Sequence, residues 1–224
     1  MKFIRQPATV PPIPPPKGVA PYGKLKNAAF APDAGFNGSP MASHLFDQMW
    51  LKKAQAALGN ERGLAMVAAD MRHEARIKGF LAWVRVIHSI GKAQGKTYGI
   101  GVLSARVIQQ FQTALPAEQI GSPVVSFRGH LIAGQKATRH EAAGNAITDV
   151  KDYRKIIEEF GKPDYELWDV RNRHLLHVYD MGNEQAMKLS IEMNKDGAEV
   201  VSAFYVPMIS VESAIKNVDY VPIE

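Results

Sequence analysis

The sequence predicts an α+β protein built from three successive parts, and three observations support this prediction. Nine prolines fall within residues 1–40, where each removes a backbone donor and fixes φ. Residues 41–115 carry apolar side chains at helical spacing, and residues 148–206 read as one capped helix followed by four short strands. We therefore expect a Pro-rich extended arm (1–40), a basic helical region (41–115) and an α+β domain (116–224).

Composition restricts the class of protein. The 224 residues are 46% hydrophobic and 22% charged, which is normal for a globular chain. Cysteine is absent, so disulfides and thiolate metal sites are excluded. No run of about 18 apolar residues is present, and the N-terminus lacks the uninterrupted apolar segment of a secretory signal. We expect a soluble protein that no signal peptide exports.

The net charge of +5 divides unevenly along the chain. Residues 1–115 contain 15 Lys and Arg against 5 Asp and Glu, a balance of +10. Residues 116–224 contain 12 against 17, a balance of −5. A basic part joined to an acidic part indicates that the two meet different partners, with nucleic acid or an acidic protein surface facing the basic part. Ordinary solvated helix faces would give the same count.

The arm is expected to be extended or similar to polyproline II, because prolines and glycines interrupt it throughout. Single apolar residues are spread along it at intervals that suit individual docking sites: Phe3, Ile4, Tyr22, Phe30 and Phe36. An arm that becomes ordered on a partner fits this spacing, and a disordered leader is the alternative.

Three helices are expected in the basic region. Ser43 is a candidate N-cap for a first helix that ends at Gly59. The second and longer helix is expected over residues 62–90 and the third over 102–114. A flexible, glycine-containing break is expected between them, over 91–101.

The α+β domain begins with a short strand and turn within residues 122–134, followed by a polar segment over 135–147. Thr148 is then a candidate N-cap for a helix with apolar residues at i, i+3, i+4 and i+7. The buried face so defined consists of Tyr153, Ile156, Ile157 and Phe160. Gly161 and Pro163 follow this face and end the helix.

Four strands joined by hairpin-length turns follow the helix, and a short helix over 210–218 comes after them. The strands are expected at residues 165–170, 174–180, 185–193 and 198–206. The third alternates, with apolar residues from Met187 to Met193 on one face and Lys188 and Ser190 on the other. A helix packed on a four-stranded antiparallel meander is the simplest fold for these elements.

Three short motifs lack the spacing that their chemistry needs. A glycine-rich run that begins at Gly91 has three residues between its first two glycines, whereas a phosphate-binding loop needs four. Ile77 stands where the second histidine of a zinc-protease motif begun by His73 would lie. His174 and His177 are three residues apart on a strand, so they point to opposite faces. No metal or cofactor is expected.

The predicted domain also contains the groups that a metal-free ribonuclease needs, namely a general acid or base and cations that stabilise charge on a phosphate. Lys188 and Ser190 face away from the apolar side of their strand, and His177 and Tyr179 share one face of theirs, opposite Leu176. A second set precedes the helix and would fold over the open sheet face: Lys136, Arg139 and His140. The simpler interpretation is that these residues form the solvated side of a sheet.

Several segments of the chain resemble a known nuclease family. They are ITDVKDYRKI from residue 147, PDYELWDV from 163, HLLHVYD from 174, MKLSI from 187 and VVSAFYV from 200, with PVVS from 123 and Arg139-His140 upstream. The order of these elements and their hydrophobic and aromatic positions resemble the phage-borne branch of the barnase–EndoU–colicin E5/D–RelE-like nucleases. The resemblance covers about 110 residues, 115–224.

This resemblance implies a helix-plus-four-strand fold and RNA cleavage without a metal. His140 would be the acid and base, Tyr179 or Ser202 would orient the substrate, and His177 would contact it. The residues that would hold phosphate are Lys136, Arg139 and Lys188. The apolar neighbours on the strand face of Ser202 favour burial of its hydroxyl instead.

Domains of this branch often lie at the C-terminus of Mu-type phage minor head proteins, so the resemblance also implies a protein carried by or associated with a virion. The arm would then bind a portal or capsid subunit, and the basic helices would meet packaged DNA, RNA or an acidic partner. The main alternative is a structural virion protein that uses the nuclease fold as a non-catalytic interaction module. A nucleic-acid-binding accessory in the host cytoplasm is a third interpretation. Unpaired strand edges also favour a larger assembly.

Overall fold

The computed structural model describes residues 52–223, except 55, 72–73, 94–96, 116–119, 121 and 195–196. The predicted arm and most of the helix predicted after Ser43 therefore lie outside the described residues. Among the helices that the structure describes, none has the length and apolar character needed to cross a membrane.

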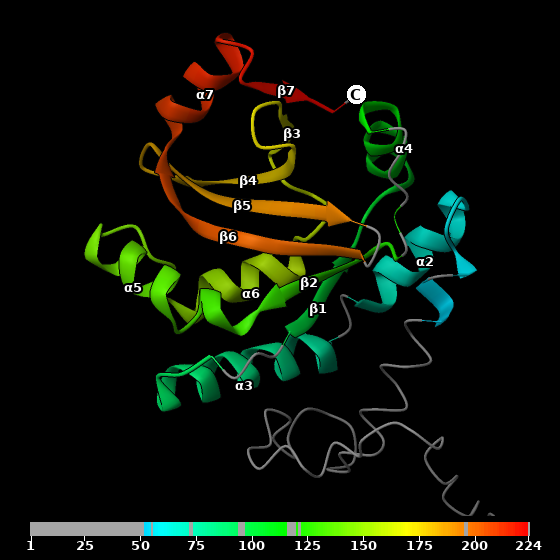
Figure 1. Ribbon diagram of the computed structural model, residues 1–224. Coiled ribbons are helices and arrows are strands. Elements are labelled where there is room, and N and C mark those ends of the chain that lie inside the picture. The colour runs from blue at the N-terminus through cyan, green and yellow to red at the C-terminus, as the bar shows by residue number, and fades with distance from the viewer. Residues whose placement is uncertain are drawn as a thin grey trace, which may run out of the picture.

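A seven-stranded mixed sheet forms the centre of the molecule (Figure 1). Its strands lie side by side in the order β1-β2-β6-β5-β4-β3-β7. The strands are β1 (Thr97–Val102), β2 (Val124–Arg128), β3 (Tyr165–Asp169), β4 (His174–Gly182), β5 (Gln185–Asn194), β6 (Gly197–Pro207) and β7 (Tyr220–Pro222). Only β2 and β6 pair in parallel among these strands, and every other neighbouring pair is antiparallel. The α+β class is confirmed, and the sheet is larger than the four strands predicted.

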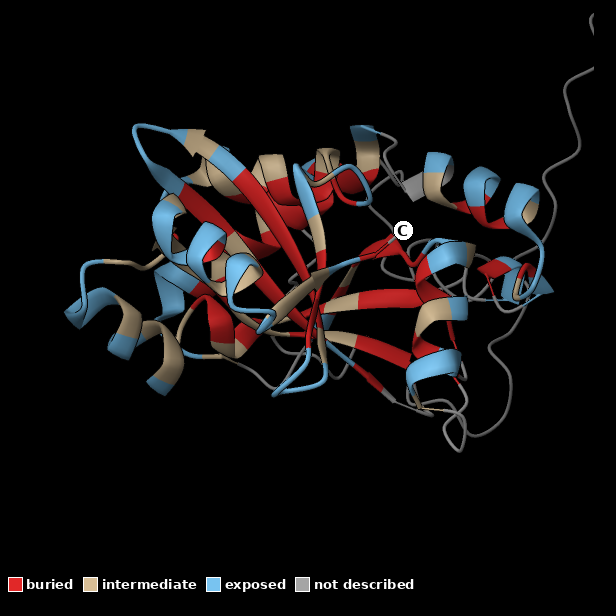
Figure 2. Cartoon of the chain, turned by 90° about the horizontal axis from the view of Figure 1, so that it is seen from above, coloured by how far each residue is buried: buried red, intermediate tan, exposed pale blue. Residues whose placement is uncertain are grey.

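Helices cover both faces of this sheet. They are α2 (Glu61–Met71), α3 (Glu74–Ile90), α4 (Ala105–Ala114), the 3-10 turn η2 (Gly129–Leu131), α5 (Gln135–Ala142), α6 (Val150–Glu158) and α7 (Met208–Lys216). α3 and α6 lie together below the sheet in Figure 1, and α7 lies on the opposite side, next to β7. Figure 2 shows that buried residues concentrate in the strands and on the inner sides of the helices.

Several predicted elements need correction. The helix predicted over 62–90 is two helices, α2 and α3, on either side of residues 72–73. The predicted break over 91–101 contains β1, and the polar segment over 135–147 contains α5. The N-cap of α6 is Asp149, whose carboxylate accepts a hydrogen bond from the Lys151 N–H at 2.8 Å, and not Thr148.

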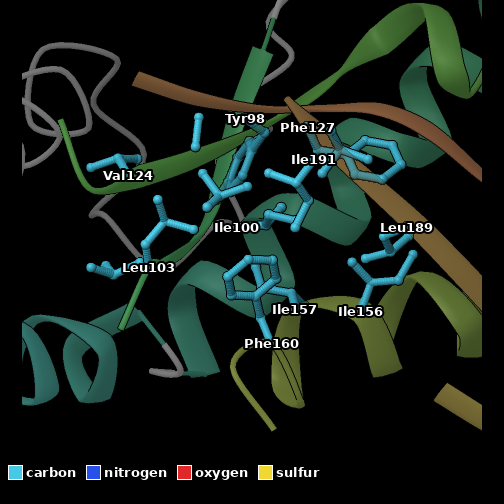
Figure 3. Close-up of a cluster of buried hydrophobic side chains, with 14 of the residues drawn as sticks. Tyr98, Ile100, Leu103, Val124, Phe127, Ile156, Ile157, Phe160, Leu189 and Ile191 are labelled. Atoms are coloured by element: carbon cyan, nitrogen blue, oxygen red, sulfur yellow. The ribbon is translucent and has the colours of Figure 1, made fainter. Parts of the chain in front are cut away.

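The main core lies between the sheet and the pair α3 and α6. The predicted buried face of α6 is confirmed, because Tyr153, Ile156, Ile157 and Phe160 are all at most 4% exposed. Figure 3 shows Ile156, Ile157 and Phe160 meeting strand residues that include Ile100 and Leu189. Burying a large apolar side chain stabilises a fold by about 1.5–3 kcal/mol, so this one helix face contributes substantially.

A smaller core lies on the other face of the sheet. It joins Leu167, Leu176, Val178 and Ala186 of the strands to Val211 of α7. The main core, by contrast, draws residues from α2 through to the C-terminal segment, including β1 and β2. The predicted boundary between residues 115 and 116 therefore falls between two strands that pair in the same sheet.

Candidate active site

The strand register decides which polar side chains share a face of the sheet. Residues that pair across antiparallel strands point to the same face. Val178 pairs with Lys188, and Lys188 pairs with Phe204. Ser190 and Ser202 pair one pleat further along. All of these residues lie on the α7 face of the sheet.

Phe204 is the centre of a polar and aromatic cluster on this face. The His140 ring stacks on the phenyl ring with a centroid distance of 4.4 Å and an interplanar angle of 14°. The Lys188 ammonium lies 4.9 Å from the same ring centroid and donates a hydrogen bond to the Tyr220 hydroxyl at 3.1 Å. Ser202 lies two residues before Phe204 on the same side of β6. We call His140, Lys188, Ser202, Phe204 and Tyr220 the Phe204 cluster.

His140 reaches this cluster because α5 covers the outer edge of β6. β2 pairs with β6 only at residues 198–200, so the rest of that edge is open to other partners. The Lys136 ammonium donates to the Val201 carbonyl at 2.6 Å, and the Tyr205 N–H donates to the Asn145 carbonyl at 2.9 Å. The segment predicted as a polar lead-in therefore closes a strand edge and carries His140 with it.

A hydrogen bond fixes the His140 imidazole. Its Nδ1 lies 3.0 Å from the side-chain oxygen of Asn145. An amide oxygen only accepts, so in this arrangement Nδ1 carries a proton and donates it to Asn145. The ring is half-buried and makes no further hydrogen bond within the described part of the chain. This arrangement leaves Nε2 as the ring nitrogen that is not engaged by the described residues.

The remaining predicted cations differ in their surroundings. Arg139 is exposed on α5 beside His140 and forms no ion pair with any described residue. Lys136 is half-buried and its ammonium is held by the β6 backbone. Of the basic residues predicted here, Lys188 enters the Phe204 cluster, whereas Arg139 is exposed on α5 and makes no contact with the cluster among the described residues.

His177 and Tyr179 lie on the opposite face of the sheet. Tyr179 pairs with Met187 and His177 with Leu189, so both point into the main core. Tyr179 is fully buried, and burial, together with nearby carboxylates, raises the pKa of its hydroxyl. The structure does not bring these two residues to Lys188. A β-bulge between Asp180 and Gly182 sets this register.

His177 instead forms part of a chain of hydrogen-bonded side chains. Its Nε2 lies 3.1 Å from Oε1 of Glu166, and Oε2 of Glu166 accepts a hydrogen bond from the Arg106 guanidinium at 2.5 Å. Burial raises the pKa of Glu166, but the hydrogen bonds and charges of His177 and Arg106 outweigh burial and hold this pKa below its ordinary value. Sequence reasoning missed Glu166 and Arg106. The β3–β4 hairpin was the available signal, because it pairs Glu166 with His177.

A small cavity of about 230 Å³ adjoins His140 on its other side. His88 and Glu141 line it together with apolar residues of η2 and the α5–α6 loop. Burial lowers the pKa of His88, and the negative charge of Glu141 partly opposes this shift. Among the described residues, no group of His, Asp and Glu side chains is arranged to hold a metal ion.

Comparison of the chain with models of protein families, with curated proteins and with solved structures finds no match.

Proposed function

We propose that the chain is a metal-independent endoribonuclease centred on the Phe204 cluster. The observation that carries this proposal is the pairing of an oriented histidine with a cation. The hydrogen bond to Asn145 leaves Nε2 of His140 without a partner among the described residues, and His140 and the Lys188 ammonium both contact the phenyl ring of Phe204. Acid–base catalysis and charge stabilisation are the two functions that RNA cleavage requires.

In the proposed reaction, Nε2 of His140 takes the proton of a ribose 2′-hydroxyl. The 2′-oxygen forms a bond to the adjacent phosphorus, and the bond from phosphorus to the 5′-oxygen of the next nucleotide breaks. The protonated His140 returns its proton to that 5′-oxygen, so the products are a 2′,3′-cyclic phosphate and a 5′-hydroxyl. Lys188 and Arg139 stabilise the negative charge that develops on the phosphate.

The family resemblance implies a helix and four strands, whereas the catalytic groups of this proposal come from α5, β5 and β6. Ser202 lies on the same strand face as Phe204 and would donate a hydrogen bond to the phosphate. Lys136 would act through the backbone of β6, by holding α5 in place. His177 and Tyr179 have no part in the proposed reaction, because they lie on the other face of the sheet.

RNA cleavage is tested with the purified full-length chain and total RNA in EDTA, which removes any contribution from divalent metals. We expect His140→Ala to reduce cleavage by roughly 10²–10⁴-fold, the usual contribution of a general acid–base residue. His174→Ala, a substitution at the start of β4, is the matched control and should cleave like the wild type. Equal cleavage by wild type and His140→Ala, or no cleavage by either, refutes the proposal.

A non-catalytic role in a virion is the second candidate. It is favoured because two of the predicted phosphate-binding lysines already bind other groups of the protein. Lys136 donates to a backbone carbonyl, and Lys188 is held by Phe204 and Tyr220. Side chains that already serve the fold are typical of an interaction module. In this role the protein would bind portal or capsid subunits through the arm and reside in the virion after assembly in the host cytoplasm.

Mass spectrometry of purified particles tests virion association independently of catalysis. Presence of the chain in stoichiometric amount, combined with an inactive wild-type protein, would support the structural role. Absence from particles would exclude both the structural role and the carriage of the nuclease by the virion.

A further inference from the structure

A larger cavity lies on the main-core side of the sheet, away from the Phe204 cluster. Its volume is about 380 Å³. Small-molecule sites usually enclose roughly 300–1,000 Å³ and combine apolar walls with a few convergent polar groups. The apolar walls here come from α2, the β1–α4 corner and the end of α6: Leu64, Ala65, Ala68, Val102, Leu103 and Phe160.

The polar groups of this cavity form a connected chain. Arg106, Glu166 and His177 all line it and are joined by hydrogen bonds of 2.5 and 3.1 Å. Both carboxylate oxygens of Glu166 are thereby engaged. The Arg106 side chain is 54% exposed and has five N–H donors, so it retains donors beyond the one given to Glu166.

His177 is the most deeply buried polar residue of this wall. The residue is 2% exposed, lines the cavity, and has a buried Nδ1 with no hydrogen-bond partner in the described part of the chain. Buried polar atoms are nearly always paired, so this imidazole nitrogen is an exception among the groups near the cavity.

The first turn of α4 points at the same space. Ser104 is the N-cap, and its hydroxyl oxygen accepts from the Val107 N–H at 3.2 Å. The N–H groups of Ala105 and Arg106 precede that capped position and have no acceptor within the helix. Ser104, Ala105 and Arg106 all line the cavity. A helix start of this kind favours a negative group, through the free N–H groups and the helix dipole.

We propose that this cavity binds a small organic monocarboxylate with an apolar body. Its carboxylate would accept hydrogen bonds from the start of α4 and from Arg106, and its apolar part would lie on the wall formed by α2. Glu61 also lines the cavity, and together with Glu166 it disfavours multiply charged anions such as phosphate. The site is separate from RNA cleavage and does not depend on it.

The test is a titration of the full-length chain with three probes. Calorimetry measures the affinity, and amide NMR locates the binding. The probes are 4-methylpentanoate, its uncharged analogue 4-methylpentanamide, and inorganic phosphate. We expect the carboxylate to bind at least about tenfold more tightly than the amide, because it forms charge-assisted hydrogen bonds. The amide signals of Ala105 and Arg106 should shift with saturation. Equal affinity for carboxylate and amide, no binding, or a preference for phosphate overturns the proposal.

Three variants locate the site. Arg106→Gln should weaken carboxylate binding roughly tenfold or more, since it removes the cationic donor. Ala65→Trp places a large ring at the exposed α2 wall, leaves the Arg106–Glu166–His177 chain intact, and should abolish binding. Arg171→Gln, an exposed arginine in the β3–β4 turn, is the control and should bind like the wild type. Wild-type affinity in Ala65→Trp would refute the location even if Arg106→Gln fails to fold.

Discussion

The imidazole of His140 and the phenyl ring of Phe204 stack nearly parallel across the edge of the sheet, 4.4 Å apart. Asn145 holds the same imidazole from its edge, through Nδ1. Two contacts from different directions therefore set the orientation of one side chain. This restraint would serve the acid–base role proposed for His140, because a catalytic group must be held in its productive orientation.

Replacing Phe204 by leucine tests whether the stack positions His140. We expect RNA cleavage to fall about tenfold, less than for His140→Ala, because the base remains but loses one restraint. The free energy of unfolding should fall by about 1 kcal/mol from the lost ring contact. Cleavage assays and urea denaturation measure the two effects. Val206→Ala, on the same face of β6, should retain activity, and an equal loss there would show that Phe204 has no special role.

Replacing Lys188 by methionine removes the ammonium and keeps the apolar stem. The contacts with Phe204 and Tyr220 should contribute only about 1 kcal/mol to stability, because Lys188 is half-buried and partly solvated. Cleavage should fall by about 10²-fold, since the cation stabilises the transition-state phosphate. Single-turnover kinetics with Lys151→Met of α6 as the control separate these effects. A large loss of stability without loss of cleavage would assign Lys188 to the fold alone.

Glu166 predicts a specific dependence of stability on pH. Its folded-state pKa lies below the ordinary value of 4.5, so below that pH the unfolded chain binds the proton first. The stability that Glu166 contributes is therefore present above about pH 4.5 and is lost as the pH falls through the folded-state pKa. Urea denaturation across the acid range should show a shallower fall for Glu166→Gln than for the wild type. The exposed Glu212→Gln should follow the wild-type slope, and identical slopes for all three would exclude this linkage.

Gly101 is required by the ring of Phe160. A Cβ added at Gly101 would lie 1.9 Å from the nearest phenyl carbon, so the ring or the strand must move. We expect Gly101→Ala to destabilise the protein by roughly 1–3 kcal/mol, the usual range for overpacking a core. Phe160→Ala makes room for the added methyl group. In a double-mutant cycle the two substitutions should therefore be less destabilising together than the sum of the single effects, and simple additivity would contradict the predicted clash.

The sequence correctly predicted those helices and strands whose buried side is set by the spacing of their own apolar residues. The α6 face and the alternation of β5 are both confirmed, because apolar spacing of 3.6 and of 2 residues leaves one choice of buried side. β1 was missed, since its sequence TYGIGV contains two glycines and becomes a strand by pairing with β2. β7 was missed for the same reason, as a three-residue strand that depends on β3.

The candidate site was predictable in part. His140, Lys188 and Ser202 were identified from residue type and resemblance, and they lie on or beside the same face. Phe204 and Tyr220 were not, because their importance comes from contacts with residues distant in sequence. The bulge at Asp180–Gly182 is a further case. Without it, a one-residue shift in register would pair Tyr179 with Lys188 and place the two side chains on the same face.

The sequence by itself determined the class of fold, the buried face of α6, the succession of strands β3 to β6 and the separation of a basic first half from an acidic second half. Tertiary structure alone decided the size of the sheet, the closure of the β6 edge by α5 and the partners of each polar residue. The physical reason is the distance along the sequence over which each feature is decided. Periodicity is a local property, whereas strand pairing, register and the meeting of His140 with Phe204 depend on segments that come together only in the folded chain.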